Sequence, residues 1–204
     1  MSRILLLACV VFNAHVLRAE EKSPPVYETP AAAFEAYVKA ASKADWKTSW
    51  ACLTPQLQDL QATESLFGLG MHDPDYEKKY LKSDIQPPAA PIKDENERQK
   101  VLLSMIRDKF VVYAAACDFQ KKNLDPVDWQ QPLREVVIDK DRAQGVVTRQ
   151  ISHLERRNGQ PAVKVLTPWG SPVYFQKTDK GWLLDAPTPE EAKRYARKFG
   201  EPTE

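Results

Sequence analysis

The stretch Val173-Tyr-Phe-Gln-Lys-Thr-Asp-Lys-Gly-Trp-Leu-Leu-Asp185 decides the fold class of this chain. Val173 and Phe175 alternate with Tyr174 and Gln176, and this period of two is typical of a pleated β-strand. The centre of the stretch, Thr178 to Gly181, is typical of a tight turn, because Gly181 can adopt positive φ without steric cost. A short apolar strand follows and ends at Asp185. The stretch therefore predicts an antiparallel hairpin that closes a curved sheet.

The residues before this hairpin predict the rest of the sheet. Strand patterns cover Leu133 to Ile138, Ala143 to Arg156 and Ala162 to Leu166. Turn signals separate them at Asp139–Arg142, at Asn158–Gly159 and at Thr167–Ser171, and the Asn-Gly pair is a strong hairpin signal. Together with the closing hairpin, they predict a meander of about five strands.

Helix-start signals fill the region before the sheet. Threonine or aspartate at a cap position, in two cases followed directly by proline, is typical of a helix N-terminus. The start signals before the sheet are Thr29, Asp45, Thr54 and Asp94, and a last short helix is predicted to begin at Thr188. The helix that opens at Asp94 is predicted to be long and to extend towards Phe119. Helices followed by an antiparallel meander indicate an α+β fold.

The first residues are typical of a secretory signal peptide. Met1 to Ala19 contains a positive Arg3, an apolar run from Ile4 to Leu17 and a small residue before the expected cleavage point. The run is about 14 residues long, shorter than the about 20 residues that a spanning helix needs. We therefore expect export to the periplasm or outside the cell, with a retained anchor as the alternative.

The remaining chain is expected to form one domain. Residues 20–28 are rich in charge and proline and predict a disordered lead. The domain is expected over residues 29–200, with a loop-rich helical insertion at about 68–93, where glycine and proline punctuate the pattern.

Composition and cysteine use narrow the function classes. The 29 basic and 28 acidic residues nearly balance, which argues against a nucleic-acid partner. No later stretch is apolar enough to cross a membrane, so no membrane partner is expected after signal cleavage. Cys52 and Cys117 would remain after cleavage. They could pair in an oxidising compartment or serve as small buried side chains. No histidine cluster accompanies them, so no metal site and no cofactor are predicted.

Three blocks of the sequence resemble a known superfamily. They are Thr29 to Pro55, Gln144 to Arg149 and Tyr174 to Asp185. Together they are similar to the cystatin-like cone of the nuclear-transport-factor, SnoaL and ketosteroid-isomerase superfamily, and more narrowly to its exported, uncharacterised bacterial members. The resemblance implies helices packed on a curved antiparallel sheet, with a pocket at the open end of the cone. Some relatives are enzymes and others only bind or dimerise, so the fold alone does not decide the function.

The candidate site residues follow from that pocket. Arg149, His153 and Glu155 share one strand face by the period of two. If that face points into the cone, Arg149 and His153 would line a binding pocket with the aromatic residues Tyr37, Trp46 and Trp50. The alternatives are a solvated strand face and tryptophans that serve as packing anchors.

The candidate catalytic residues are His153 and Asp185. A base in an apolar pocket is favoured chemically, because burial raises the pKa of a carboxylate. Asp185 could instead cap the turn that follows its strand. No phosphate-binding glycine loop and no nucleophile motif is present.

The sequence therefore favours a non-catalytic module for binding or assembly, with a small-molecule isomerase or hydrolase as the alternative. The expected partners are a small apolar ligand in the pocket or a second copy bound through the sheet face. The identity of the ligand stays open.

Overall fold

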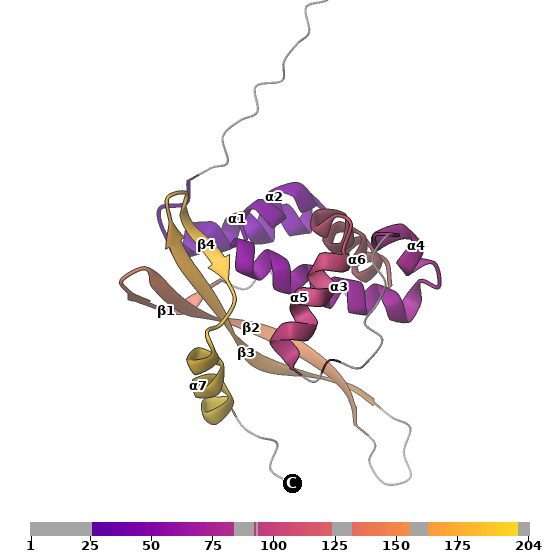
Figure 1. Cartoon of the computed structure of the whole chain (residues 1–204). Helices are drawn as coiled ribbons and strands as arrows, with labels where there is room; N and C mark the ends of the chain where they lie inside the picture. Colours follow the sequence, from indigo (N-terminus) through magenta and orange to yellow (C-terminus); the bar gives the residue numbers. More distant parts are fainter. Residues whose placement is uncertain (1–25, 84–91, 93, 124–131, 156–162, 200–204) are drawn as a thin grey trace, which may run out of the picture.

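The computed structural model describes residues 26–83, 92, 94–123, 132–155 and 163–199 (Figure 1). The side chains of 149–169 and 195–199 lie outside this description, and so do the expected signal peptide and the Asn158–Gly159 turn. The elements are α1 (Pro30–Ser42), α2 (Trp46–Ala51), α3 (Pro55–His72), α4 (Tyr76–Tyr80), α5 (Glu95–Met105), α6 (Lys109–Asn123), β1 (Arg134–Asp139), β2 (Arg142–Glu155), β3 (Val163–Thr178), β4 (Gly181–Asp185) and α7 (Pro189–Phe199). Helices come first and an antiparallel sheet follows, so the predicted α+β class is confirmed.

The predicted cap residues begin the first three helices. Thr29 Oγ1 accepts from Ala32 N at 3.1 Å, and Thr54 Oγ1 accepts from Leu57 N at 3.2 Å. Asp45 Oδ1 accepts from Thr48 N at 3.1 Å. Each bond satisfies one of the amide groups that the first turn of a helix leaves without a partner.

The end of α1 has an alanine in a position that favours glycine. Ala44 has a φ of 58°, the left-handed region. Its amide donates to Ala41 O at 3.0 Å, and the amide of Asp45 donates to Ala40 O at 2.9 Å. These two bonds form a Schellman motif, which satisfies the last carbonyl groups of the helix. The turn directs the chain from α1 into α2 at the cost of placing a Cβ at positive φ.

Helix α3 is longer than predicted. The loop-rich stretch was expected to begin at Gly68, but α3 continues to His72 and α4 follows after a short turn. Leu66 and Leu69 are buried in a core cluster with residues of α6, and the ring of His72 stacks on Phe119 at 4.8 Å. This packing outweighs the low helix propensity of the glycines.

The prediction of a single long helix after Asp94 is wrong. It is divided into α5 and α6 at Ile106–Asp108. Ile106 leaves the helix and forms an antiparallel bridge with Leu81, and the amide of Arg107 donates to Tyr80 O at 2.9 Å. Asp108 then accepts from Val111 N at 3.1 Å and begins the next helix. A tertiary contact with the end of α4 therefore breaks a pattern that is locally continuous.

The sheet has four strands in the order β1-β2-β3-β4 within the described residues, all antiparallel neighbours. The fifth strand was predicted from a turn at Thr167–Ser171, and this prediction is wrong because β3 runs through that segment. The pairing of β2 with β3 is unbroken from Arg142↔Gln176 to Glu155↔Val163.

Two prolines inside β3 explain why the turn was predicted and why the strand tolerates them. The amide of Lys177 donates to Asp141 O at 2.7 Å, so odd-numbered residues of β3 direct their backbone groups towards β2. Pro168 and Pro172 are even-numbered, and β4 pairs with β3 only from Tyr174 onwards. Their missing N–H groups therefore lie on an edge that pairs with no other described strand, where proline breaks no ladder bond.

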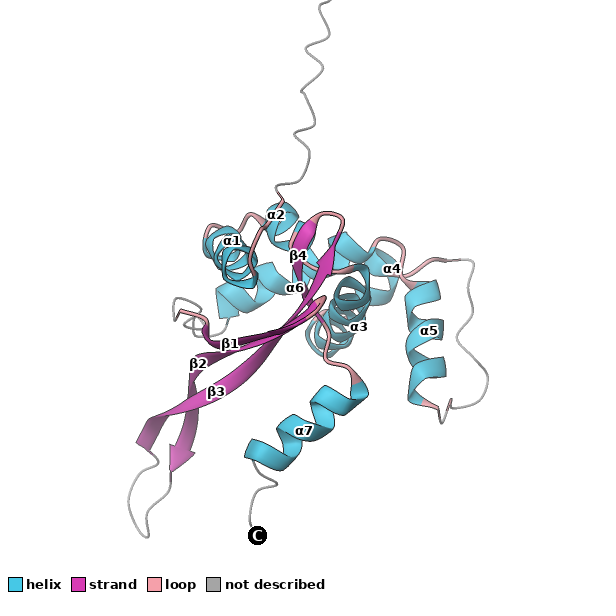
Figure 2. Cartoon of the chain, turned by 90° about the vertical axis from the view of Figure 1, so that its left-hand side faces the viewer, coloured by secondary structure: helices cyan, strands magenta, loops and turns pink. Residues whose placement is uncertain are grey.

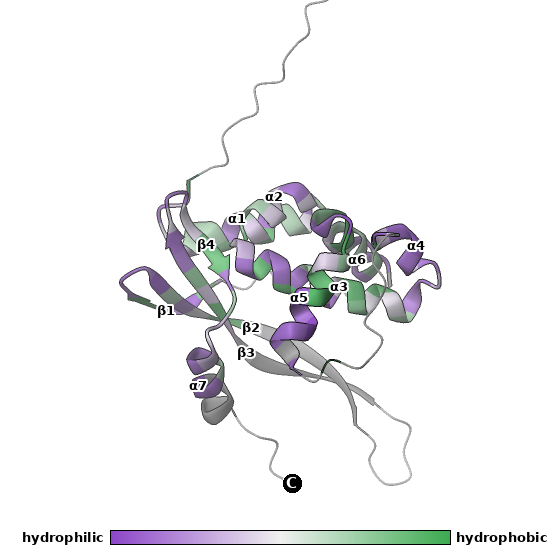
Figure 3. Ribbon diagram, viewed as in Figure 1, coloured by the Kyte–Doolittle hydropathy of each residue, from purple (hydrophilic) through white to green (hydrophobic). Residues whose placement is uncertain are grey.

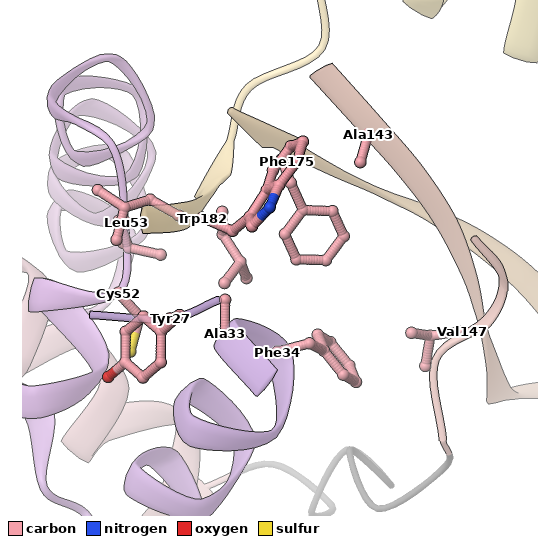
Figure 4. Packing of buried hydrophobic residues seen from close by; sticks show 11 residues of the cluster. Tyr27, Ala33, Phe34, Cys52, Leu53, Ala143, Val147, Phe175 and Trp182 are labelled. Carbon is pink, nitrogen blue, oxygen red and sulfur yellow. The ribbon is translucent and has the colours of Figure 1, made fainter. Parts of the chain in front are cut away.

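Helices cover one part of this sheet only. A first cluster of buried residues joins α1 and the end of α2 to β4 and the neighbouring parts of β2 and β3. Figure 4 shows Phe175 and Trp182 of the sheet beside Ala33 and Phe34 of α1. A second cluster lies between α3 and α6, and Trp50 packs against both clusters. The hydropathy colouring shows the apolar character of β4 and of parts of α3 and α6 (Figure 3).

One edge of the sheet is closed by the chain itself. On β4, the amides of Trp182 and Leu184 donate to Tyr27 O at 2.8 Å and Cys52 O at 2.9 Å. The amide of Thr54 donates back to Leu184 O at 2.8 Å. Tyr27 was assigned to a disordered lead over residues 20–28; that assignment is wrong for Tyr27, which is buried in the first cluster.

The opposite edge of the sheet, formed by β1, is more exposed to solvent. The ribbon of β2 and β3 extends well beyond helices α1 to α6 (Figure 2). All residues of β1 are exposed to solvent. The helical layer therefore leaves a large part of the sheet uncovered.

The strained alanine gives a direct test of the α1–α2 turn. We expect Ala44→Gly to raise the free energy of unfolding by about 1 kcal/mol, because glycine removes the steric penalty of positive φ. Urea unfolding monitored by circular dichroism measures the change. Ala32→Gly, at an exposed helical position, serves as the matched control and should lower stability by about 1 kcal/mol. A loss of stability in both variants would contradict the assigned turn geometry.

Candidate functional site

A cluster of three ionisable side chains in the described part of the chain contains Asp185, one of the predicted catalytic candidates, with Arg142 and Glu191. Asp185 is the last residue of β4, and its carboxylate accepts from Arg142 Nη1 and from Thr54 Oγ1. Arg142 Nη2 donates to Glu191 Oε2 at 2.6 Å and to Ala186 O at 3.2 Å. The cluster thus joins the beginnings of β2, α3 and α7 to the end of β4.

Local structure positions each member of the cluster. Arg142 and Asp185 lie on strands that flank β3, and their partners on β3 are Gln176 and Tyr174. A capping box orients Glu191: the amide of Glu191 donates to Thr188 Oγ1 at 3.2 Å, and the amide of Thr188 donates to Glu191 Oε2 at 2.7 Å. The carboxylate of Glu191 therefore has two roles: it caps the N-terminus of α7 and it binds Arg142.

Burial and charge act in opposite directions on these groups. Burial alone would raise the pKa of Glu191, but the hydrogen bonds from Arg142 and from the Thr188 amide outweigh it and lower the pKa. Burial would lower the pKa of Arg142, but the two carboxylates raise it overall. The cluster is therefore held as a cation between two anions.

This arrangement makes Asp185 a poor general base. Its side chain is 5% exposed, and both oxygens already accept hydrogen bonds from Arg142 and Thr54. A general base needs a lone pair that can reach a substrate proton, and the fold already uses both oxygens of this carboxylate. The structure thus places the Asp185 side chain inside the protein, at the end of β4 and bound to Arg142 and Thr54.

Three members of the cluster, Thr54, Arg142 and Glu191, were not predicted as site residues, although Thr54 was predicted to begin a helix. Glu191 had a detectable signal, because Thr188 and Glu191 have the spacing of a capping box. Arg142 had none, because the sequence places it at the end of a turn and shows no partner nearby.

The predicted aromatic residues Tyr37, Trp46 and Trp50 lie at helix interfaces. Trp46 Nε1 donates to Asp118 Oδ1 at 2.8 Å, which ties α2 to α6. The ring of Trp50 lies 4.9 Å from the ring of Tyr113, and Tyr37 packs against the first core cluster. The two tryptophans thus pack between helices, and a part for them in ligand binding stays a prediction.

A buried hydroxyl group lies beside these rings. Tyr113 Oη is 3.1 Å from Ser49 Oγ, and both residues are almost fully buried. Burial raises the pKa of Tyr113 far above its usual range. Burial likewise raises the pKa of the Cys117 thiol to about 11, so this thiol is mostly protonated at neutral pH.

Cys52 and Cys117 are free thiols in the structure. Cys52 Sγ lies 3.3 Å from Tyr27 Oη in the first core cluster. Pairing of the two cysteines under oxidising conditions stays a prediction.

The strand candidates Arg149, His153 and Glu155 lie on β2, where the structure describes the backbone and the pairing. Arg149 faces Trp169 across the ladder, and His153 faces Val165. Their side chains lie outside the described residues, so their role in a pocket stays a prediction.

Other kinds of site have no support in the described ranges. No group of three metal-ligating side chains is present there. None of the described helices is long and apolar enough to cross a membrane. Comparison with protein-family models, curated proteins and solved structures finds no match for this chain.

The ion cluster predicts a strong stability effect. We expect Asp185→Asn to lower the free energy of unfolding by about 3 kcal/mol, because it removes a buried carboxylate that is one of two counter-charges of Arg142. Urea unfolding measures the loss. Asp179→Asn, in the exposed β3–β4 turn, is the control and should change stability by less than about 0.5 kcal/mol. Equal effects of the two variants would show that the cluster does not stabilise the fold.

The cluster also predicts a pH dependence. The lowered pKa of Glu191 stabilises the fold above the ordinary value of 4.5, and this contribution disappears as the pH falls below it. Glu191→Gln should therefore be less stable than the parent at neutral pH and lose less stability on acidification. Unfolding curves recorded from neutral pH to below 4.5 test this, with exposed Glu190→Gln as the control. Parallel pH profiles for parent and Glu191→Gln would contradict the role of Glu191.

Proposed function

We propose that this chain is an exported, non-catalytic assembly module that binds another polypeptide through the open side of its sheet. The observation that carries the proposal is the exposure of β1. Its side chains Val137 and Ile138 are 67% and 55% exposed, and among the described strands β1 pairs with β2 alone. Large apolar side chains on an unpaired strand are typical of an interaction surface.

The contrast between the two edges supports this proposal. The chain closes the edge at β4 with backbone hydrogen bonds from Tyr27, Cys52 and Thr54. Among the described residues, no comparable cover lies on β1, where every residue is exposed. A protein that seals one edge and leaves apolar residues on the other has a surface suited to a partner.

The state of the polar cluster supports a role without catalysis. Asp185 is bound by Arg142 and Thr54, and Glu191 is bound by Arg142 and the Thr188 amide. A general base needs a lone pair that can reach a substrate proton. In this cluster, the carboxylates bind partners of the fold itself.

The proposal includes membership in the nuclear-transport-factor and SnoaL-like superfamily. Helix α1 packs against β4 and the adjoining sheet, as a cystatin-like cone requires. The signal-like residues Met1 to Ala19 support a place outside the cytoplasm. Binding and dimerising members of that superfamily make a non-catalytic role consistent with the fold.

Native mass spectrometry of the full-length chain tests the proposal. We expect complexes that contain a further polypeptide, either a second copy or another protein. Val137→Lys should abolish them, because a charge on β1 opposes docking of an apolar surface. Phe67→Lys is the matched control, since Phe67 on α3 is equally exposed at 72%. This control should retain the complexes.

Two results would contradict the proposal. One is a small-molecule mass lost on denaturation with no polypeptide partner, which would favour the pocket-binding or enzymatic alternative. The other is an equal loss of complexes in both variants, which would place the surface elsewhere.

A further inference from the structure

We infer that α7 is a detachable helix, held to the rest of the protein by the pairing of Glu191 with Arg142, and that protonation of Glu191 releases it while the sheet stays folded. This inference goes beyond the proposed function and does not depend on the partner of β1. It follows from the exposure of α7, from the separate attachment of β4 and from the balance of charges in the cluster.

In the described part of α7, a single side chain is withdrawn from solvent. Glu191 is half-buried, and its Oε2 atom accepts from Arg142 Nη2 at 2.6 Å. Among the described hydrogen bonds and ion pairs, this pairing is the one that joins a side chain of α7 to another element. The other described side chains of the helix are exposed to solvent: Pro189, Glu190, Ala192, Lys193 and Arg194.

Helix α7 is too short to be stable once it is detached. It has 11 residues, and isolated helices shorter than about 12–15 residues are marginal in water. The Glu191 oxygen that binds Arg142 also accepts from the amide of Thr188 at 2.7 Å and so caps the helix. Protonation of this carboxylate therefore weakens the attachment and the cap at the same time. Release and unfolding of α7 are expected to occur together.

Strand β4 is held by contacts that do not involve Glu191. It pairs with β3 along its length, and the amides of Trp182 and Leu184 donate to carbonyl groups outside the sheet. The carboxylate of Asp185 also accepts from Thr54 Oγ1. Loss of the Glu191 pairing therefore leaves β4 in place, and α7 is the element that becomes free.

The charges of the cluster permit this release. Arg142 of β2 faces Glu191, and Asp185 of β4 binds the same guanidinium group. The side chain of Glu191 is 19% exposed and that of Asp185 is 5% exposed, so solvent protons reach Glu191 more readily. When Glu191 is protonated, Arg142 still has Asp185 as a counter-charge. Release of α7 therefore leaves no buried cation without an anion.

The direction of the pH dependence follows from the surroundings of Glu191. Burial raises the pKa of Glu191, but the hydrogen bonds from Arg142 and the Thr188 amide outweigh it and hold the pKa below its ordinary value of 4.5. A carboxylate with a lowered pKa stabilises the attached state above that ordinary value, and the contribution is lost as the pH falls through the lowered pKa. We therefore expect α7 to be attached at neutral pH and released on acidification.

Hydrogen exchange of the full-length chain, followed by amide NMR, tests the inference. Protection factors are compared rather than rates, because the intrinsic exchange rate itself depends on pH. The amides of Lys193 and Arg194 report on α7, and those of Trp182 and Leu184 report on β4. Glu191→Gln is the test variant.

The matched control is Glu190→Gln, which removes the same charge from the exposed neighbouring position in the first turn of α7. It keeps the pairing with Arg142.

At neutral pH, we expect Glu191→Gln to lower the protection of α7 about tenfold, the effect of losing one hydrogen bond between charged groups. Glu190→Gln should change it by less than about threefold, because only the interaction with the helix dipole is lost. Acidification to below 4.5 should lower the protection of α7 in the parent and change it little in Glu191→Gln. The protection of β4 should stay the same in both variants.

Three results would overturn the inference. Equal protection of α7 in the parent and in Glu191→Gln would show that other groups hold the helix. A parallel loss of protection in β4 would show that α7 opens only when the sheet unfolds. Protection of α7 that does not respond to acidification in the parent would show that protonation of Glu191 does not release it.

Discussion

The ion pair between Arg142 and Asp185 is the interaction on which the arrangement of the elements depends. It holds the beginning of β2 to the end of β4, and through Thr54 and Glu191 it fixes where α3 and α7 begin. Taking these charges out of water is costly, so the geometry persists only while the donors and acceptors remain matched. Arg142 Nε is the exception, because it is buried without a partner in the structure. The cluster therefore limits how far α7 or β4 can move independently.

The same cluster shapes the functional interpretation. Asp185, which the sequence predicted as a candidate base, instead binds Arg142 and Thr54. Its carboxylate therefore serves the fold as a counter-charge. The apolar side chains that the fold leaves exposed include Val137 and Ile138 on the sheet edge at β1. The closed edge at β4 strengthens this reading, because Gly181 at φ 82° lets Tyr27 approach closely enough to cap that strand. One edge is thus built to exclude a partner, and the other exposes apolar side chains.

The features that the sequence predicted correctly depend on chemistry within a few residues. Thr29, Asp45 and Thr54 cap helices because their side chains reach their own first turn, and Gly181 forms the predicted hairpin turn. The predictions that were wrong concern residues whose structure is determined by contacts with segments distant in the sequence. Ile106 leaves its helix to pair with Leu81, and Pro168 stays in a strand because its missing N–H group lies on an edge that pairs with no other described strand. The partnership of Arg142 with Asp185 joins residues 43 positions apart, so no local pattern could reveal it.

The charges and the bulge of β1 both limit association along this edge. Arg134, Glu135, Asp139 and Lys140 are exposed around its apolar centre, and charged side chains on an edge strand oppose edge-to-edge pairing. The bulge at Glu135 adds a limit on length, because regular pairing cannot extend past it. An exposed apolar edge is a hazard for a protein that meets many copies of itself, and the charges and the bulge together reduce that hazard.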